Sequence, residues 1–298
     1  MSHSTVLVIV EEAEDEFAAI QAAEQALDPF DENMQVEPYV NGKVEADAIK
    51  YALDEPNLTD EEVEAILTTE SEDTEEVLES YFGRRPEFRD GRYMEMSTYN
   101  PKSKWDWYSL GGRWDGQLPK KGQKEGVNVL QKKDLDMAGA IRKAEFEANE
   151  AYDTFEEVLA SLNGIEPGPS WEEILKNNDQ GEGSDYDSTK LEIARAQYHN
   201  DVWRSMMREK MNLFLSDPVD VFYYNKGGRQ AYVENAKKNV ISTFAVLDSD
   251  GEWWERGDMG WFGMVSDEMD GEEWLDTFNR LIENSSDDAW FLVYDVHI

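Results

Sequence analysis

Residues 4–10 read STVLVIV, and residues 11–27 continue as EEAEDEFAAIQAAEQAL. The first run is β-branched and apolar, as in a buried strand, and the second carries apolar residues at helical spacing as far as Leu27. Pro29 ends that helix. Residues 289–298, AWFLVYDVHI, predict a final strand, so strand segments stand at both ends of the sequence.

Further strands are expected between these ends, at residues 92–99, 105–110, 240–247 and 252–256. We expect the strand at 105–110 to pair with the one at 92–99, and a hairpin turn to join the last two. A helix is expected over residues 272–283.

These elements predict an α+β fold with an antiparallel or mixed sheet, of which a ferredoxin-like sheet is one form. The N-terminal, central and C-terminal strands would form this sheet. Two stretches with helical patterns, residues 44–82 and 134–215, are interpreted as large helical insertions. We expect residues 1–298 to form a single domain.

The composition excludes several classes of protein. The chain has 298 residues, 40% of them hydrophobic, which is too many for a fully disordered chain. It has no cysteine, so disulfides, thiolate metal sites and cysteine nucleophiles are excluded. No apolar run near the start is long enough for a signal peptide or membrane span, and we expect a cytoplasmic protein that does not bind membranes.

The net charge of −38 is unevenly distributed. Residues 1–80 hold 2 basic and 24 acidic side chains, residues 81–146 hold 14 and 9, and residues 147–298 hold 12 and 33. Such a surface repels nucleic acids, so no direct nucleic-acid binding is expected. The acidic flanks could mimic a polyanion toward a basic partner protein, or serve only to keep the protein solvated.

Two of the three histidines lie at opposite ends of the sequence. If the first and last strands pair antiparallel, His3 approaches His297, and Asp295 shares the face of His297 because it lies two residues earlier. These three side chains could bind a divalent metal such as Zn, Mn or Fe, or act as acid and base in catalysis. The alternative is that both histidines end edge strands in solvent.

The densest motif is KWDWYSLGGRWDG, at residues 104–116. Its turn at Gly111 and Gly112 is free to adopt positive φ and to expose backbone N–H groups, and Arg113 could hold a phosphate or carboxylate. Trp105 and Trp107 would alternate onto one face and stack a base or sugar. The alternative is a hairpin with a buried indole core. The candidate ligand-binding residues are Lys104, Trp105, Trp107, Gly111, Gly112, Arg113 and Trp261, the last from a Gly-rich aromatic loop.

Several motifs resemble, in the same order, a family of uncharacterised tailed-phage proteins. They are residues 1–9 (MSHSTVLVI), 28–33 (DPFDEN), 104–114, 257–263 (GDMGWFG) with Asp267 and Glu268, and 295–298 (DVHI). The family usually has Phe where this chain has Ser4, and often Cys where it has Val296. The resemblance leaves out residues 44–92 and 134–239. It implies phage origin and an infected bacterial host, but no mechanism.

Two functional interpretations follow, and whether the protein is an enzyme stays open. In the first, it is a phage accessory protein, a counter-defence inhibitor whose acidic surface blocks a nucleic-acid-binding host protein that has a basic surface. In the second, a pocket binds or hydrolyses a small nucleotide-like anion, with a divalent metal as an open cofactor. A virion or assembly component is a further alternative. The sequence does not define the oligomeric state.

Overall fold

A computed structural model describes residues 2–162, 164–166, 168–178, 188–211, 227–260 and 264–297. The chain forms two compact units. One contains residues 1–114, 245–268 and 292–298, and the other contains residues 115–244 and 269–291. The single domain expected from the sequence stays a prediction. No helix in the described ranges is both long and apolar enough to cross a membrane.

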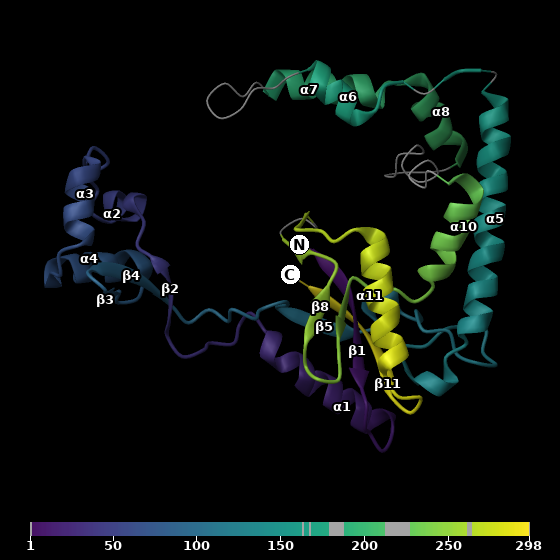
Figure 1. The fold of residues 1–298 in the computed structure, drawn as a ribbon, viewed down its shortest axis with the longest axis horizontal. Coiled ribbons are helices and arrows are strands. Elements are labelled where there is room, and N and C mark those ends of the chain that lie inside the picture. Colours follow the sequence, from purple (N-terminus) through teal and green to yellow (C-terminus); the bar gives the residue numbers. More distant parts are fainter. Residues whose placement is uncertain are drawn as a thin grey trace. The chain divides into compact units, whose positions relative to one another are not determined.

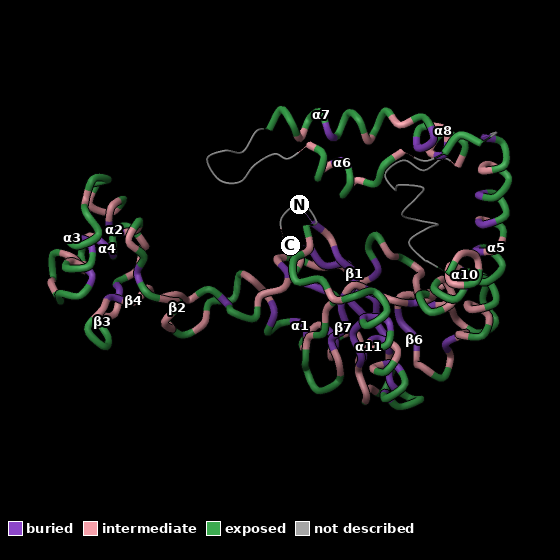
Figure 2. The backbone as a smooth tube through the Cα atoms, turned by 45° about the horizontal axis from the view of Figure 1, so that its top comes forward, coloured by how far each residue is buried: buried purple, intermediate pink, exposed green. Residues whose placement is uncertain are grey.

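The predicted α+β class is confirmed by a mixed central sheet in the order β5-β11-β1-β7-β8, whose strands are labelled in Figures 1 and 2. The first and last strands of the chain lie side by side in it, and β1 is buried along most of its length. β7 pairs parallel to β1, whereas β5 pairs antiparallel to β11 and β8 antiparallel to β7. The bounds are β1 His3–Val10, β5 Trp107–Leu110, β7 Ala245–Leu247, β8 Trp253–Glu255 and β11 Trp290–His297.

Helix α1 (Glu16–Leu27) follows β1, as the sequence predicts, and packs against it. Asp15 caps the helix by accepting a hydrogen bond from the Ala18 N–H at 2.9 Å. Along the chain, β1, α1, β7, β8, α11 and β11 follow the strand–helix–strand–strand–helix–strand pattern. A ferredoxin-like sheet places the third strand of that pattern beside the first, whereas here the second, β7, takes this place.

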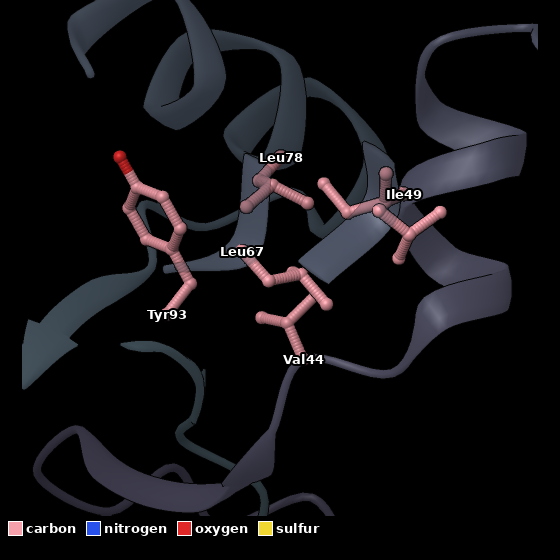
Figure 3. Close-up of a cluster of buried hydrophobic side chains, with 6 residues drawn as sticks. Val44, Ile49, Leu67, Leu78 and Tyr93 are labelled. Atoms are coloured by element: carbon pink, nitrogen blue, oxygen red, sulfur yellow. The ribbon is translucent and has the colours of Figure 1, made fainter. Parts of the chain in front are cut away.

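Residues 39–97 form a small three-stranded sheet, β2-β4-β3, covered by three short helices. The predicted pairing of residues 92–99 with 105–110 is wrong, because β4 pairs with β2 and β3. These strands share a core of their own with the helices, in which Leu67, Leu78 and Tyr93 pack together (Figure 3). The bounds are β2 Tyr39–Lys43, α2 Ala46–Ala52, α3 Asp60–Leu67, α4 Glu72–Phe82, β3 Glu87–Arg89 and β4 Arg92–Ser97.

The second unit is mainly helical, as predicted for residues 134–215 in the part that is described. Tyr152, Phe155 and Trp203 belong to one buried cluster there. Helix α10 was not predicted. The bounds are α5 Met137–Ser161, α6 Trp171–Asn177, α7 Ser188–His199, α8 Val202–Met211, α10 Gly228–Lys238 and α11 Gly271–Asn284, with β6 Val129–Gln131 beside β11. Short strands β9 (Asp258–Met259) and β10 (Val265–Ser266) complete the first unit.

Candidate functional site

His3 and Asp295 form a buried pair at the end of the central sheet. His3 begins β1, Asp295 lies near the end of the neighbouring strand β11, and Oδ1 of Asp295 is 2.8 Å from Nδ1 of His3. The side chain of His3 is 10% exposed and that of Asp295 only 3%. His3 and Asp295 therefore lie close together, as expected from strands at the two ends of the chain that lie side by side.

A second histidine–carboxylate pair lies next to the first. Nδ1 of His297 is 2.6 Å from Oδ1 of Asp106, and the N–H of Asp106 donates to the carbonyl of His297 at 3.0 Å. Asp106 was not among the site residues predicted from the sequence. Its position directly before Trp107 could have indicated this contact, because Trp107 pairs with His297 between strands β5 and β11.

The two imidazoles and one indole form a compact aromatic group. The ring centroids of His3 and His297 are 4.9 Å apart in an edge-to-face arrangement. Trp107 stacks on His297 at 5.2 Å and meets His3 edge-on at 5.4 Å. Because Trp107 is 45% exposed, its indole forms an outer cover over both imidazoles.

The Gly-Gly turn holds Asp295 in place. The backbone N–H of Arg113 donates to Oδ2 of Asp295 at 3.0 Å, so both carboxylate oxygens are engaged. Gly112 has φ +52°, and a Cβ there would lie 2.5 Å from Asp295 Oδ2 and 2.7 Å from Ser109 Oγ. Only glycine allows this backbone to approach the carboxylate so closely. The turn therefore adopts positive φ as expected, but the N–H of Arg113 donates its hydrogen bond to Asp295 within the protein.

Trp105 and Trp107 do not share a face. Trp105 is 7% exposed, its Nε1–H donates to the carbonyl of Leu27 at 3.1 Å, and its ring meets that of Tyr108 edge-on. Tyr108 and Trp107 are consecutive in β5 and therefore point to opposite faces. Trp105 thus packs in the core, and the two indoles cannot stack on one ligand as predicted.

The other predicted ligand-binding residues have different roles. Nζ of Lys104 lies 2.5 Å from Glu255 and 3.6 Å from Asp258. The N–H of Gly111 donates to the carbonyl of Val293 at 2.8 Å, a bond of the sheet edge. The side chain of Arg113 is exposed and pairs with no carboxylate in the described ranges. Trp261 lies outside the described residues.

A cavity of about 610 Å³ opens beside His297. Its charged lining consists of four carboxylates and one ammonium group, those of Glu32, Asp106, Glu255, Asp258 and Lys104. Its other lining residues are Tyr99, Ser103, Trp105, Met259, Gly260 and His297. Burial raises the pKa of the Glu255 carboxyl above its ordinary value, while the hydrogen bond and charge of Lys104 act in the opposite direction.

Nε2 of His297 is a buried polar atom that has no hydrogen-bond partner among the described residues. The side chain is 7% exposed and lines the cavity. Its other ring nitrogen, Nδ1, is already engaged by Asp106.

The predicted metal site of His3, Asp295 and His297 finds no support in the geometry. Within the described ranges, no group of three or more histidine and carboxylate side chains is arranged to hold a metal ion. Asp295 gives its two oxygens to His3 and to the Arg113 N–H, while His297 turns Nδ1 toward Asp106. His3 pairs with Asp295 and His297 pairs with Asp106, and the catalytic role expected of His3, Asp295 and His297 stays a prediction.

Comparisons of the chain with family models, with curated proteins and with solved structures found no match.

Proposed function

We propose that the cavity beside His297 binds a small polar molecule and that the Asp106–His297 pair in its lining accepts a hydrogen bond or a proton from it. The supporting observation is this pair, because both of its members line the cavity and Oδ1 of Asp106 lies 2.6 Å from Nδ1 of His297. The side chain of Asp106 is 29% exposed and that of His297 is 7% exposed, so a ligand would contact the pair from the side of Asp106.

Asp106 prepares His297 for that role. A carboxylate only accepts hydrogen bonds, so Nδ1 of His297 carries the proton in their 2.6 Å contact. In the neutral imidazole the lone pair is then on Nε2, which is buried, so the carboxylate of Asp106 is the acceptor of the pair that is open to a ligand. The arrangement resembles the carboxylate–histidine pairs of general base catalysis, in which the carboxylate fixes the tautomer.

His3 and Asp295 would support the same base from the neighbouring strand. The edge of one imidazole meets the face of the other at 4.9 Å, and Trp107 closes over both rings. Asp295, held by the Arg113 N–H, keeps His3 oriented.

The other interpretations from the sequence stay predictions. A counter-defence inhibitor with an acidic surface is supported by the net charge and by the resemblance to phage proteins, and a virion component by that resemblance alone. The small-molecule site has support from contacts of named side chains. A small-molecule site of this kind is compatible with a phage protein and with a cellular protein, because function depends on the site.

Nuclear magnetic resonance of the three histidine rings tests the proposal. Variants of single histidines assign the signals of His3, His199 and His297, and a set of fragment-sized amines, alcohols, amides and sugars is added to the intact protein. We expect a binding fragment to shift the ring signals of His297 and His3 while those of His199 in α7 stay in place.

Two variants separate a direct role from a structural one. His297→Gln is expected to weaken the fragment at least about tenfold, which corresponds to the loss of one well-placed hydrogen bond. His199→Gln, its matched control, should leave the affinity unchanged. The proposal fails if no fragment moves the His297 signals, or if both variants change the affinity equally.

A further inference from the structure

We infer that Asn100 is a positioning residue, which sets the place of Asp106 against His297 through the backbone between them. The inference rests on the proposed function, since it names a residue that acts through the same pair. Asn100 lies between β4 and β5, is 2% exposed and does not line the cavity. A polar side chain that is buried so deeply makes its hydrogen bonds inside the protein.

The amide of Asn100 joins two segments that are far apart in the sequence. Its Nδ2 donates to the carbonyl of Pro29 at 2.8 Å and to that of Asp31 at 3.0 Å. Its Oδ1 accepts a hydrogen bond from the N–H of Lys102 at 3.0 Å. An amide supplies donors and an acceptor at once, whereas an ionised carboxylate of the same shape only accepts. The side chain of Asn100 therefore holds the two segments together.

The two joined segments continue side by side as far as the site. The N–H of Lys104 donates to the carbonyl of Phe30 at 2.8 Å, and the N–H of Glu32 donates to the carbonyl of Trp105 at 2.8 Å. Both bonds lie next to the residues that Asn100 holds. They fix the backbone that directly precedes Asp106.

Residues 104–106 lie between this held segment and the end of β11. The N–H of Trp105 donates to the carbonyl of Phe30 at 3.3 Å, whereas the N–H of the next residue, Asp106, donates to the carbonyl of His297 at 3.0 Å. A shift of Phe30 would therefore move Asp106 relative to His297. The contact between Oδ1 of Asp106 and Nδ1 of His297 is 2.6 Å long and weakens steeply when its geometry changes.

Nuclear magnetic resonance of the intact protein carrying Asn100→Asp tests the inference. The variant keeps the size of the side chain and an acceptor for the N–H of Lys102, but it replaces the amide donors by a carboxylate. We expect the ring signals of His297 to move and its Nδ1–H to exchange with water at least about tenfold faster, because the contact with Asp106 loosens. The affinity of a fragment that binds the cavity should fall about three- to tenfold.

Two control variants separate positioning from stability. Asn128→Asp makes the same change in the second unit, where Nδ2 of Asn128 donates to a carboxylate at 2.6 Å. Leu78→Ala weakens the separate core of residues 39–97. Both should lower the free energy of unfolding in urea and leave the His297 signals in place. If Asn100→Asp does not fold, Asn100→Ala removes the same donors without adding a charge and is measured in its place.

Unchanged His297 signals in a folded Asn100 variant would overturn the inference and leave Asn100 a purely stabilising role. Equal shifts in Leu78→Ala or Asn128→Asp would overturn it as well, because a loss of stability would then explain them. If the signals move only in the Asn100 variant but the fragment binds as tightly as before, the inference stands and the proposed function fails. If no fragment binds the unmodified protein, the proposed function fails too, while the His297 signals still decide the role of Asn100.

Discussion

Replacing Gly112 by alanine should destabilise the protein because this residue brings the backbone against Asp295. Gly112 has φ +52°, and an L-residue in that conformation costs about 1–2 kcal/mol. The new Cβ would also lie 2.5 Å from Asp295 Oδ2 and 2.7 Å from Ser109 Oγ, and such overpacking costs about 1–3 kcal/mol. The two costs together predict a loss of about 2–5 kcal/mol in the free energy of unfolding.

Gly251→Ala is the matched control for this variant. Gly251, in the turn between β7 and β8, has φ +80°, and a Cβ there meets no atom within 4 Å. It carries the backbone cost alone, so a loss of about 1–2 kcal/mol is expected. The difference between the two variants measures the crowding around Asp295.

Urea unfolding followed by tryptophan fluorescence gives both free energies, and the histidine signals report on the site. In Gly112→Ala the displaced carboxylate should release His3, so the ring signals of His3 should move. In Gly251→Ala they should keep their positions. Equal destabilisation of the two variants, or unchanged His3 signals in Gly112→Ala, would refute the close approach of Gly112 to Asp295.

Two further predictions concern stability. Lys104→Met leaves the partly buried Glu255 without its cation, so a loss of about 1–2 kcal/mol is expected at pH 7. Because the folded-state pKa of Glu255 is already raised by burial and should rise further, the protonated form is favoured by folding. The variant's free energy of unfolding should then fall as the pH rises from the ordinary value of 4.5 through that pKa; equal losses at pH 4.5 and pH 7 would contradict this. Leu78→Ala opens a cavity in the core of residues 39–97 and should cost about 2–5 kcal/mol in urea unfolding, whereas a loss below about 1 kcal/mol would show that this core is not close-packed.

The strands at the two ends of the chain could be predicted because each is encoded in its own stretch of sequence. The apolar runs at residues 4–10 and 289–298 are long enough to specify buried strands, and β1 and β11 appear there. Strand pairing is encoded less directly. Residues 92–99 carry a strand pattern, but the pattern does not say which core the strand joins, and β4 joins the helices of residues 44–82.

The site could be predicted only in part for similar reasons. The approach of His3 to Asp295 depends on strand adjacency, which the two apolar runs suggest. The partner of His297 depends on where β5 begins. A strand that included residue 105 would place Trp105 and Trp107 on the same face. The strand β5 starts only at Trp107, however. The residues before it turn Trp105 into the core and Asp106 toward His297.

The position of β11 between β1 and β5 has a consequence for the kinetics of folding. Almost the whole chain separates β1 from β11, so their pairing is a contact of very long sequence separation and closes slowly. Until β11 inserts, one edge of β1 and one edge of β5 lack their partner, and such edges are prone to aggregation. A chain stalled before β11 would hold other walls of the cavity without His297, so recovery of ligand affinity after dilution from urea should mark the last step of folding.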